Sequence, residues 1–168
     1  MNKILSEKWW FIVCLLFLSL VYITNLLVLL TGDAGKYAAI SRNIVESGDW
    51  INLHIHQQAY DQKPHLIFWL GALSFKLFGI SAFAFKLPIL FFSILGFYSS
   101  YRLGKFLYNK AVGIVALLVL ASSEIWILFS NDIHTDLLMA SATVFGIWQL
   151  MVFLKYKKAL HFVLGVVS

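Results

Sequence analysis

The chain has 168 residues, of which 61% are hydrophobic and 12% are charged, and its mean hydropathy is +0.83. A soluble domain carries about a quarter charged residues, so this composition excludes a soluble globular protein and indicates a membrane protein. The net charge of +5 does not indicate nucleic-acid binding, because the basic residues flank apolar segments and form no patch interleaved with aromatic side chains. The single cysteine, Cys14, lies in an apolar run and indicates neither a disulfide nor a metal cluster.

The first apolar segment, residues 9–30, is long enough to cross a membrane as a helix, which takes about 20 residues. Trp9 and Trp10 stand at its beginning and favour the boundary between lipid and water. A signal peptide has a shorter apolar core followed by a small-residue cleavage site, and this segment has neither feature. We therefore expect a retained membrane anchor.

Residues 31–82 follow as an external loop and include the one long polar stretch of the sequence. Within this loop Asp33 lies at the start of an expected amphipathic helix that Gly48 ends, with Tyr37 on its apolar face. Such a helix suits the membrane surface. Residues 50–56 alternate in polarity and favour a short strand or an extended loop.

Three later segments can also cross the membrane, and they are residues 83–103, 111–130 and 137–154. In the first of them we expect Lys86 to extend to the membrane surface and Pro88 to be tolerated near the helix start. The expected fold is an all-α polytopic membrane protein with about four transmembrane helices and amphipathic juxtamembrane helices in the first external loop. A further apolar segment begins at residue 161, and we expect it to be a truncated span of a longer protein.

The topology depends on residues 66–75, which are apolar but short for a span. If this segment does not cross, the basic residues near the amino terminus, at 102–110 and at 155–158 all lie on the cytoplasmic side. The positive-inside rule favours that arrangement. It also brings the loops around Asp33 and Asp136 together on the outer face.

Ionisable groups at a membrane boundary cost free energy and are therefore candidates for function. Taken singly, Asp33 and Asp136 are explained by helix capping, and Lys63 by an ordinary interfacial lysine. His54 and His56 lie on one face of an extended segment, but zinc needs a third protein ligand that no spacing marks. We expect interfacial histidines there and assign no metal site.

Taken together, several motifs resemble those of one enzyme family. They are Gly32-Asp33-Ala34-Gly35-Lys36-Tyr37, Glu46-Ser47-Gly48-Asp49-Trp50, Tyr60-Asp61-Gln62-Lys63-Pro64, Phe83-Ala84-Phe85-Lys86-Leu87-Pro88 and Thr135-Asp136-Leu137-Leu138. In order and spacing they resemble the C-type membrane glycosyltransferases, which include the protein O-mannosyltransferases and the aminoarabinose transferase of lipid A modification. The resemblance identifies residues 1–168 as the N-terminal part of a glycosyltransferase transmembrane domain.

The resemblance implies a multi-pass enzyme of the plasma (inner) membrane with its active site on the extracytoplasmic side. Its partners would be a polyprenyl-phosphate-linked sugar, a lipid or protein acceptor and membrane lipids. By resemblance Asp33 and Asp136 are the catalytic acidic residues, while Lys63, Tyr37 and Tyr60 bind the donor phosphate. Because family members are several hundred residues longer, we expect this chain alone to be inactive.

The chemistry of glycosyl transfer calls for these types of group. A carboxylate can accept or orient the proton of the attacking acceptor. An ammonium and phenolic donors stabilise the charge that grows on the departing phosphate. A direct displacement with attack and departure on opposite faces inverts the anomeric configuration.

The sequence departs from the family pattern at four positions, namely Ala34, Lys36, Gln62 and His65. Gln62 stands where some relatives carry an acidic residue that helps to hold a metal. No cofactor is therefore assigned, and a divalent cation is left open. Two alternatives stay open beside the enzyme: an inactive membrane fragment or polyprenyl-lipid-binding partner, and a transporter subunit, although the latter predicts charges inside the spans rather than at their ends.

Overall fold

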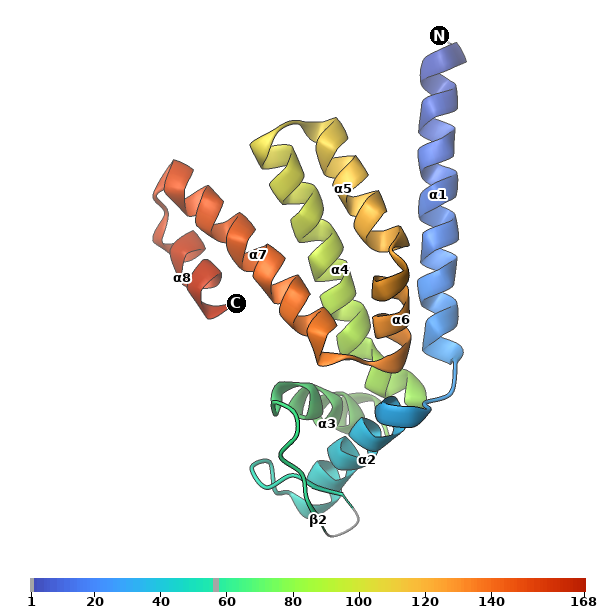
Figure 1. Ribbon diagram of the computed structural model, residues 1–168, viewed down its shortest axis with the longest axis vertical. Helices are drawn as coiled ribbons and strands as arrows, with labels where there is room; N and C mark the ends of the chain where they lie inside the picture. Colours follow the sequence, from blue (N-terminus) through green and yellow to red (C-terminus); the bar gives the residue numbers. More distant parts are fainter. Residues whose placement is uncertain (1, 56–57) are drawn as a thin grey trace.

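The chain folds into eight helices and one short hairpin within residues 2–55 and 58–168, the part that this computed structural model describes (Figure 1). His56, one of the two histidines considered above, lies outside the described residues. The elements are α1 (Asn2–Leu27), α2 (Gly32–Ser47), β1 (His54–Ile55), β2 (Gln58–Ala59), α3 (Leu66–Phe78), α4 (Ala82–Leu107), α5 (Lys110–Ser122), α6 (Glu124–Asp132), α7 (Thr135–Tyr156) and α8 (Ala159–Val167). The strands are antiparallel, with His54 opposite Ala59.

Helices α1, α4 and α7 are each long and apolar enough to cross a membrane. The segment 111–130, expected as one helix, is instead the pair α5 and α6, which meet at an angle of 53°. The break falls at two serines, because the Ser123 hydroxyl donates to the Leu120 carbonyl (2.8 Å) and competes with the helical backbone. If the bent pair counts as one span, the described residues contain four candidate spans, and the expected all-α polytopic membrane fold is confirmed.

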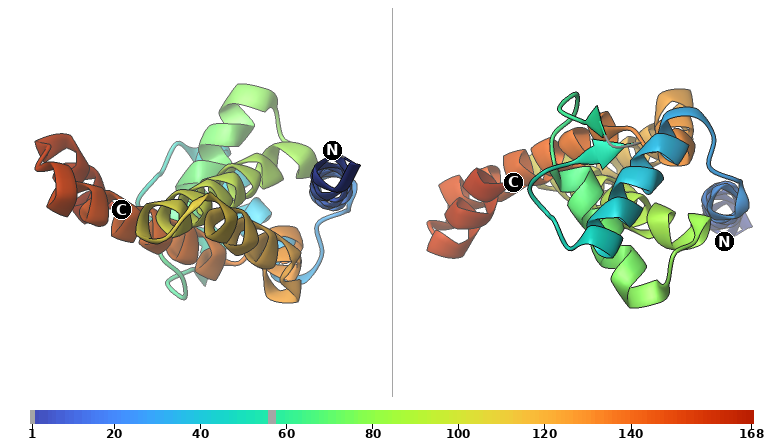
Figure 2. Two further views of the ribbon diagram at one scale, coloured as in Figure 1. Left: turned by 90° about the horizontal axis from the view of Figure 1, so that it is seen from above. Right: turned by 90° about the horizontal axis from the view of Figure 1, so that it is seen from below.

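The helices α2 and α3 and the hairpin lie across one end of the bundle formed by α1 and α4–α7 (Figure 1). The last turn of α1, the beginning of α4 and the α6–α7 junction are at this same end, which we call the loop end. The α4–α5 and α7–α8 turns, with their basic residues, are at the opposite end. Figure 2, which looks along the bundle, places α1 and α8 on opposite sides of it.

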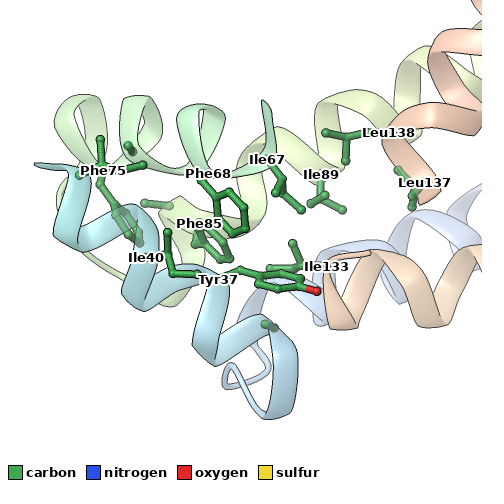
Figure 3. Packing of buried hydrophobic residues seen from close by; sticks show 14 of the residues in the cluster. Tyr37, Ile40, Ile67, Phe68, Phe75, Phe85, Ile89, Ile133, Leu137 and Leu138 are labelled. Atoms are coloured by element: carbon green, nitrogen blue, oxygen red, sulfur yellow. The ribbon is translucent and has the colours of Figure 1, made fainter. Parts of the chain in front are cut away.

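The short apolar helix α3 packs beside α2 at the loop end and does not run alongside the long helices (Figure 1). Ile40 of α2, Phe68 of α3 and Phe85 of α4 are at most 2% exposed and form the centre of this contact (Figure 3). Gly71 permits the close approach, because a Cβ atom there would lie 2.6 Å from the Ser41 Oγ atom and would clash with the Phe85 ring. The loop is thereby anchored to the bundle by apolar burial.

Pro88 lies inside α4, seven residues from its beginning, and cannot donate to the carbonyl of Ala84 four residues earlier. The buried hydroxyl of Ser74 in α3 donates to that carbonyl instead, at 2.5 Å. A side chain of the neighbouring helix therefore satisfies the backbone group that the proline leaves free. This contact also fixes α3 against the beginning of α4.

The expectation that Lys86 extends to the membrane surface is wrong. Its side chain is buried, at 1% exposure, and points to the end of α1. The ammonium donates to the carbonyls of Asn25 (2.7 Å) and Val28 (3.0 Å) and to Oδ1 of Asn131 in α6 (3.1 Å). The carbonyls at a helix C-terminus lack intrahelical partners and attract cations, so they replace water as acceptors for this lysine.

Candidate functional site

Asp33 is the second residue of α2, and its carboxylate is about half exposed. Thr31 occupies the N-cap position, so Asp33 does not have the capping role that is its simplest explanation. The carboxylate instead lies 3.1 Å from the ammonium of Lys36, one turn further along the helix. The first turn of α2 therefore presents a carboxylate and an ammonium side by side.

Asp136 has the corresponding position in α7, where it is also the second residue and is exposed. The turn before it depends on Ile133, which has a left-handed backbone (φ 59°) and is fully buried. That conformation is rare for a β-branched residue and persists only where the surroundings impose it. Both acidic residues thus stand near helix N-termini, where the helix dipole favours negative charge.

Tyr37 and Tyr60 both pack edge-on against Phe68, with ring centroids 5.5 Å and 5.6 Å from it. Tyr37 belongs to α2 and is 3% exposed, whereas Tyr60 directly follows the hairpin and is half-buried. Figure 3 shows the phenol of Tyr37 pointing toward Ile133 at the α6–α7 junction. Phe68 therefore brings the two phenols, from separate segments, to the same place.

Burial raises the pKa of Tyr37 to about 12, and the nearby Tyr60 phenol and the carboxylates of Asp33 and Asp136 act in the same direction. Burial also raises the pKa of Tyr60. The negative charge of Asp33 raises it further, and the positive charge of Lys36 acts against this rise. Both phenols are consequently neutral hydrogen-bond donors at pH 7. The charges of Asp33 and Asp136 both act on Tyr37, and we call the region around these two carboxylates and the two phenols the tyrosine site.

Lys63 lies beside this region in an open hollow of about 600 Å³. The hollow is lined by residues 51–54 and 59–65, so Tyr60 borders both the hollow and the tyrosine site. The side chain of Lys63 is half-buried. Lys63 and Tyr60 line the same hollow, and within the described chain no hydrogen bond or ion pair joins Lys63 to Asp33 or Asp136.

The loop that walls the hollow is held by hydrogen bonds. Oδ1 of Asp49 accepts from the backbone N–H groups of Ile51 and Asn52, both at 2.9 Å, and Oδ2 accepts from the Asn52 side chain. These bonds lower the pKa of the Asp49 carboxyl to about 2. The indole of Trp69 donates to the Trp50 carbonyl at 2.6 Å, which ties the same loop to α3.

The described residues contain no group of three His, Cys, Asp or Glu side chains that could hold a metal ion. A ring nitrogen of His54 lies 2.9 Å from its near neighbour, the Asn52 carbonyl. The described chain therefore offers no cage of its own for the divalent cation that the sequence leaves open.

Two residues near the site were missed by sequence reasoning. Lys36 was noted only as a departure from the family pattern, although its spacing of three from Asp33 is the spacing of an intrahelical ion pair. Lys86 was placed at the membrane surface. The sequence signal for its burial is that apolar residues flank it on both sides within the first turns of α4.

Residues 62–168, more than half of the chain, match the model of the dolichyl-phosphate-mannose-protein mannosyltransferase family. The chain belongs to this family. The resemblance to C-type membrane glycosyltransferases is thereby confirmed, and the protein is an integral membrane member of a glycosyltransferase family.

Two curated relatives of this family member are undecaprenyl phosphate-α-4-amino-4-deoxy-L-arabinose arabinosyl transferases. The one from Proteus mirabilis is 29% identical over 126 residues, which are 73% of this chain and 23% of the relative. The one from Yersinia enterocolitica is 32% identical over 110 residues, which are 64% of this chain and 20% of the relative. The chain thus spans less than a quarter of the length of either enzyme.

The fold matches crystal structures of ArnT from Cupriavidus metallidurans. The apo structure has a TM-score of 0.76 at 22% identity, covering 86% of this chain and 27% of that one. The structure bound to undecaprenyl phosphate has a TM-score of 0.74 at the same identity, covering 83% and 26%. The family member therefore has the fold of one part of that larger membrane protein.

Proposed function

We propose that the protein transfers a glycosyl group from a polyprenyl-phosphate sugar donor to a lipid or protein acceptor, with inversion at the anomeric carbon. The proposal extends membership in a glycosyltransferase family to a specific reaction and to specific residues. It concerns the complete protein, because the chain spans only about a fifth of the relatives whose names describe that chemistry. The site lies, in this proposal, on the extracytoplasmic side of the inner membrane.

The observation that carries the proposal is the convergence of Asp33, Asp136, Tyr37 and Tyr60 at the loop end. These residues come from α2, the hairpin segment and α7, which are far apart in the sequence. Two carboxylates and two neutral phenols in one region supply proton acceptors next to hydrogen-bond donors. Lys63, adjacent to Tyr60, adds a cation within reach of the same boundary.

In the proposed reaction the acceptor oxygen attacks the anomeric carbon while the bond from that carbon to the donor phosphate breaks. Asp33 accepts or orients the proton of the attacking hydroxyl, and Asp136, at the beginning of α7, is the second carboxylate that can accept or orient this proton. The electron pair of the broken bond stays on the polyprenyl phosphate. Lys63 and the phenols of Tyr37 and Tyr60 stabilise this negative charge, and their effect is greatest at the transition state, where the charge on the leaving oxygen grows.

The similarity to the aminoarabinose transferases favours 4-amino-4-deoxy-arabinose on undecaprenyl phosphate as the first donor to test. It favours a lipid acceptor of the lipid A type over a protein. The apolar surroundings of the loop end agree with a donor and an acceptor that are both anchored in the bilayer.

The decisive experiment measures transfer of labelled sugar by membrane vesicles that contain the complete protein. Candidate undecaprenyl-phosphate donors are supplied with a lipid A acceptor, and the configuration of the product is determined. We expect Asp33→Asn and Lys63→Ala to reduce transfer at least a hundredfold, as removal of a transition-state contact does, while membrane insertion persists.

Glu46→Gln is the matched control for Asp33→Asn. Glu46 lies in the same helix, is about half exposed and is likewise paired with a neighbouring cation, Arg42, at 2.6 Å. Near-normal transfer by Asp33→Asn would remove this residue as the base. If the wild-type protein binds undecaprenyl phosphate but transfers no sugar, the alternative of a polyprenyl-lipid-binding partner replaces the enzyme.

A further inference from the structure

The helix α1 is the least buried of the three long helices. Only 11% of its apolar span is buried, compared with 39% for the spans of α4 and α7. Among its described side chains, two near its end make polar contacts with other helices: the Tyr22 hydroxyl donates to the Ala121 carbonyl at 3.0 Å, and the Asn25 amide donates to the Ser130 hydroxyl at 3.2 Å. The position of the chain that follows α1 therefore depends on few contacts.

Lys86 is the centre of these contacts. Its three ammonium protons match three acceptors, two carbonyls at the end of α1 and the side-chain oxygen of Asn131 in α6. The lysine itself comes from α4 and is 1% exposed. One side chain therefore joins three helices at the loop end.

Two of the acceptors of Lys86 precede the two carboxylates of the tyrosine site by the same number of residues. Val28 lies five residues before Asp33, and Asn131 lies five residues before Asp136. The intervening segments are short turns, and the second one contains the buried, left-handed Ile133. A displacement of either acceptor would consequently be transmitted to the carboxylate that follows it.

We propose that Lys86 is a positioning residue. Its ammonium binds acceptors at the end of α1 and at the end of α6, and these hydrogen bonds set the separation of Asp33 and Asp136. The lysine touches neither the donor nor the acceptor in this role. A buried ammonium with three good acceptors is directional, whereas apolar packing alone would let α1 slide along its neighbours. The inference rests on the proposed function only for its effect on the reaction, since the separation itself is measurable without turnover.

The test uses spin labels on the complete protein. Cys14 and every cysteine outside residues 1–168 are exchanged for serine, and one cysteine each is placed at Leu29 and Met139, which are exposed and lie close to Asp33 and Asp136 in the chain. Double electron–electron resonance then gives the distribution of label separations. We expect a narrow distribution for the wild-type background, a broader and shifted one for Lys86→Met, and a narrow one again for Lys86→Arg, which retains a buried cation with several donors.

Two further variants separate positioning from general damage. Lys105→Met makes the same exchange in the last turn of α4, where the lysine is exposed, and should leave the distribution unchanged. Asn131→Leu removes the acceptor in α6 but leaves Lys86 bound to the carbonyls of Asn25 in α1 and of Val28 directly after it, so the buried charge keeps two acceptors. It should broaden the distribution even if Lys86→Met fails to fold.

In the transfer assay Lys86→Met should lower kcat roughly tenfold to a hundredfold, because misplacement by about 1 Å costs that much, while the KM for the donor changes little. An unchanged distribution of separations in both Lys86→Met and Asn131→Leu would overturn the positioning role, whatever the activity. Absence of transfer by a wild-type protein with a narrow distribution would instead contradict the proposed reaction and leave the positioning role standing.

Discussion

The Nζ atom of Lys36 lies 3.1 Å from the Oδ1 atom of Asp33, one turn earlier in the same helix. Both side chains are more than half exposed, and exposed ion pairs of this spacing contribute less than about 1 kcal/mol to stability. This ion pair therefore contributes little to the stability of the protein. Since the charge of Lys36 also acts on Tyr60, the lysine belongs to the electrostatics of the tyrosine site.

Replacing Lys36 by methionine tests this assignment. We expect the free energy of unfolding to change by less than about 0.5 kcal/mol, and the KM for the polyprenyl-phosphate donor to rise, because a cation is lost beside the proposed phosphate position. Chemical denaturation and transfer kinetics measure the two effects. Arg42→Met is the control, since it breaks the pair with Glu46 further along α2, and an equal rise of KM in that variant would contradict a local role for Lys36.

Tyr37→Phe removes a buried phenol whose pKa is raised to about 12. Because the folded pKa lies above the ordinary value near 10, the contribution of this group to stability is fully present below pH 10 and is lost as the pH rises through about 12. Wild-type protein should therefore lose more stability between pH 9 and pH 11.5 than Tyr37→Phe. Denaturant unfolding at the two pH values checks this, and equal losses would show that the phenol titrates normally.

The Asp49 carboxylate should hold its loop down to strongly acidic pH. Its pKa is lowered to about 2, so its contribution is present above the unfolded value near 3.8 and is lost only as the pH falls through about 2. We expect the amide protons of Ile51 and Asn52 to be protected from exchange at pH 5, and Asp49→Ala to remove that protection. Exchange measured by mass spectrometry would refute this if the variant and the wild type were equally protected.

Ser74→Ala should destabilise the protein by about 1–3 kcal/mol, because it leaves the buried carbonyl of Ala84 without any donor. Ser93→Ala is the matched control. Its hydroxyl is fully buried and also donates to a carbonyl in α4, that of Ile89, but there the helical N–H of Ser93 can still serve the same acceptor. Denaturant unfolding of the two variants compares them, and an equal loss would remove the special role of Ser74 beside Pro88.

The location of the candidate residues could be predicted in part. Tyr37 was expected on the apolar face of an amphipathic helix, and it is buried on that face. The helix period suffices for such a prediction, because it depends on residues within a few positions of one another. The edge-on packing of Tyr37 and Tyr60 on Phe68 could not be predicted, since it joins three segments whose relative placement no local pattern encodes.

The sequence by itself determined that this chain is a polytopic helical membrane protein, because the length and apolarity of a segment decide whether it can cross a bilayer. Only the tertiary structure decided that α3 lies across the loop end and that Lys86 is buried on the end of α1. Each of these depends on hydrogen bonds or apolar contacts between distant residues. Such contacts exist only once the helices have packed, and they bring the beginnings of α2 and α7, which carry Asp33 and Asp136, to the same end of the bundle.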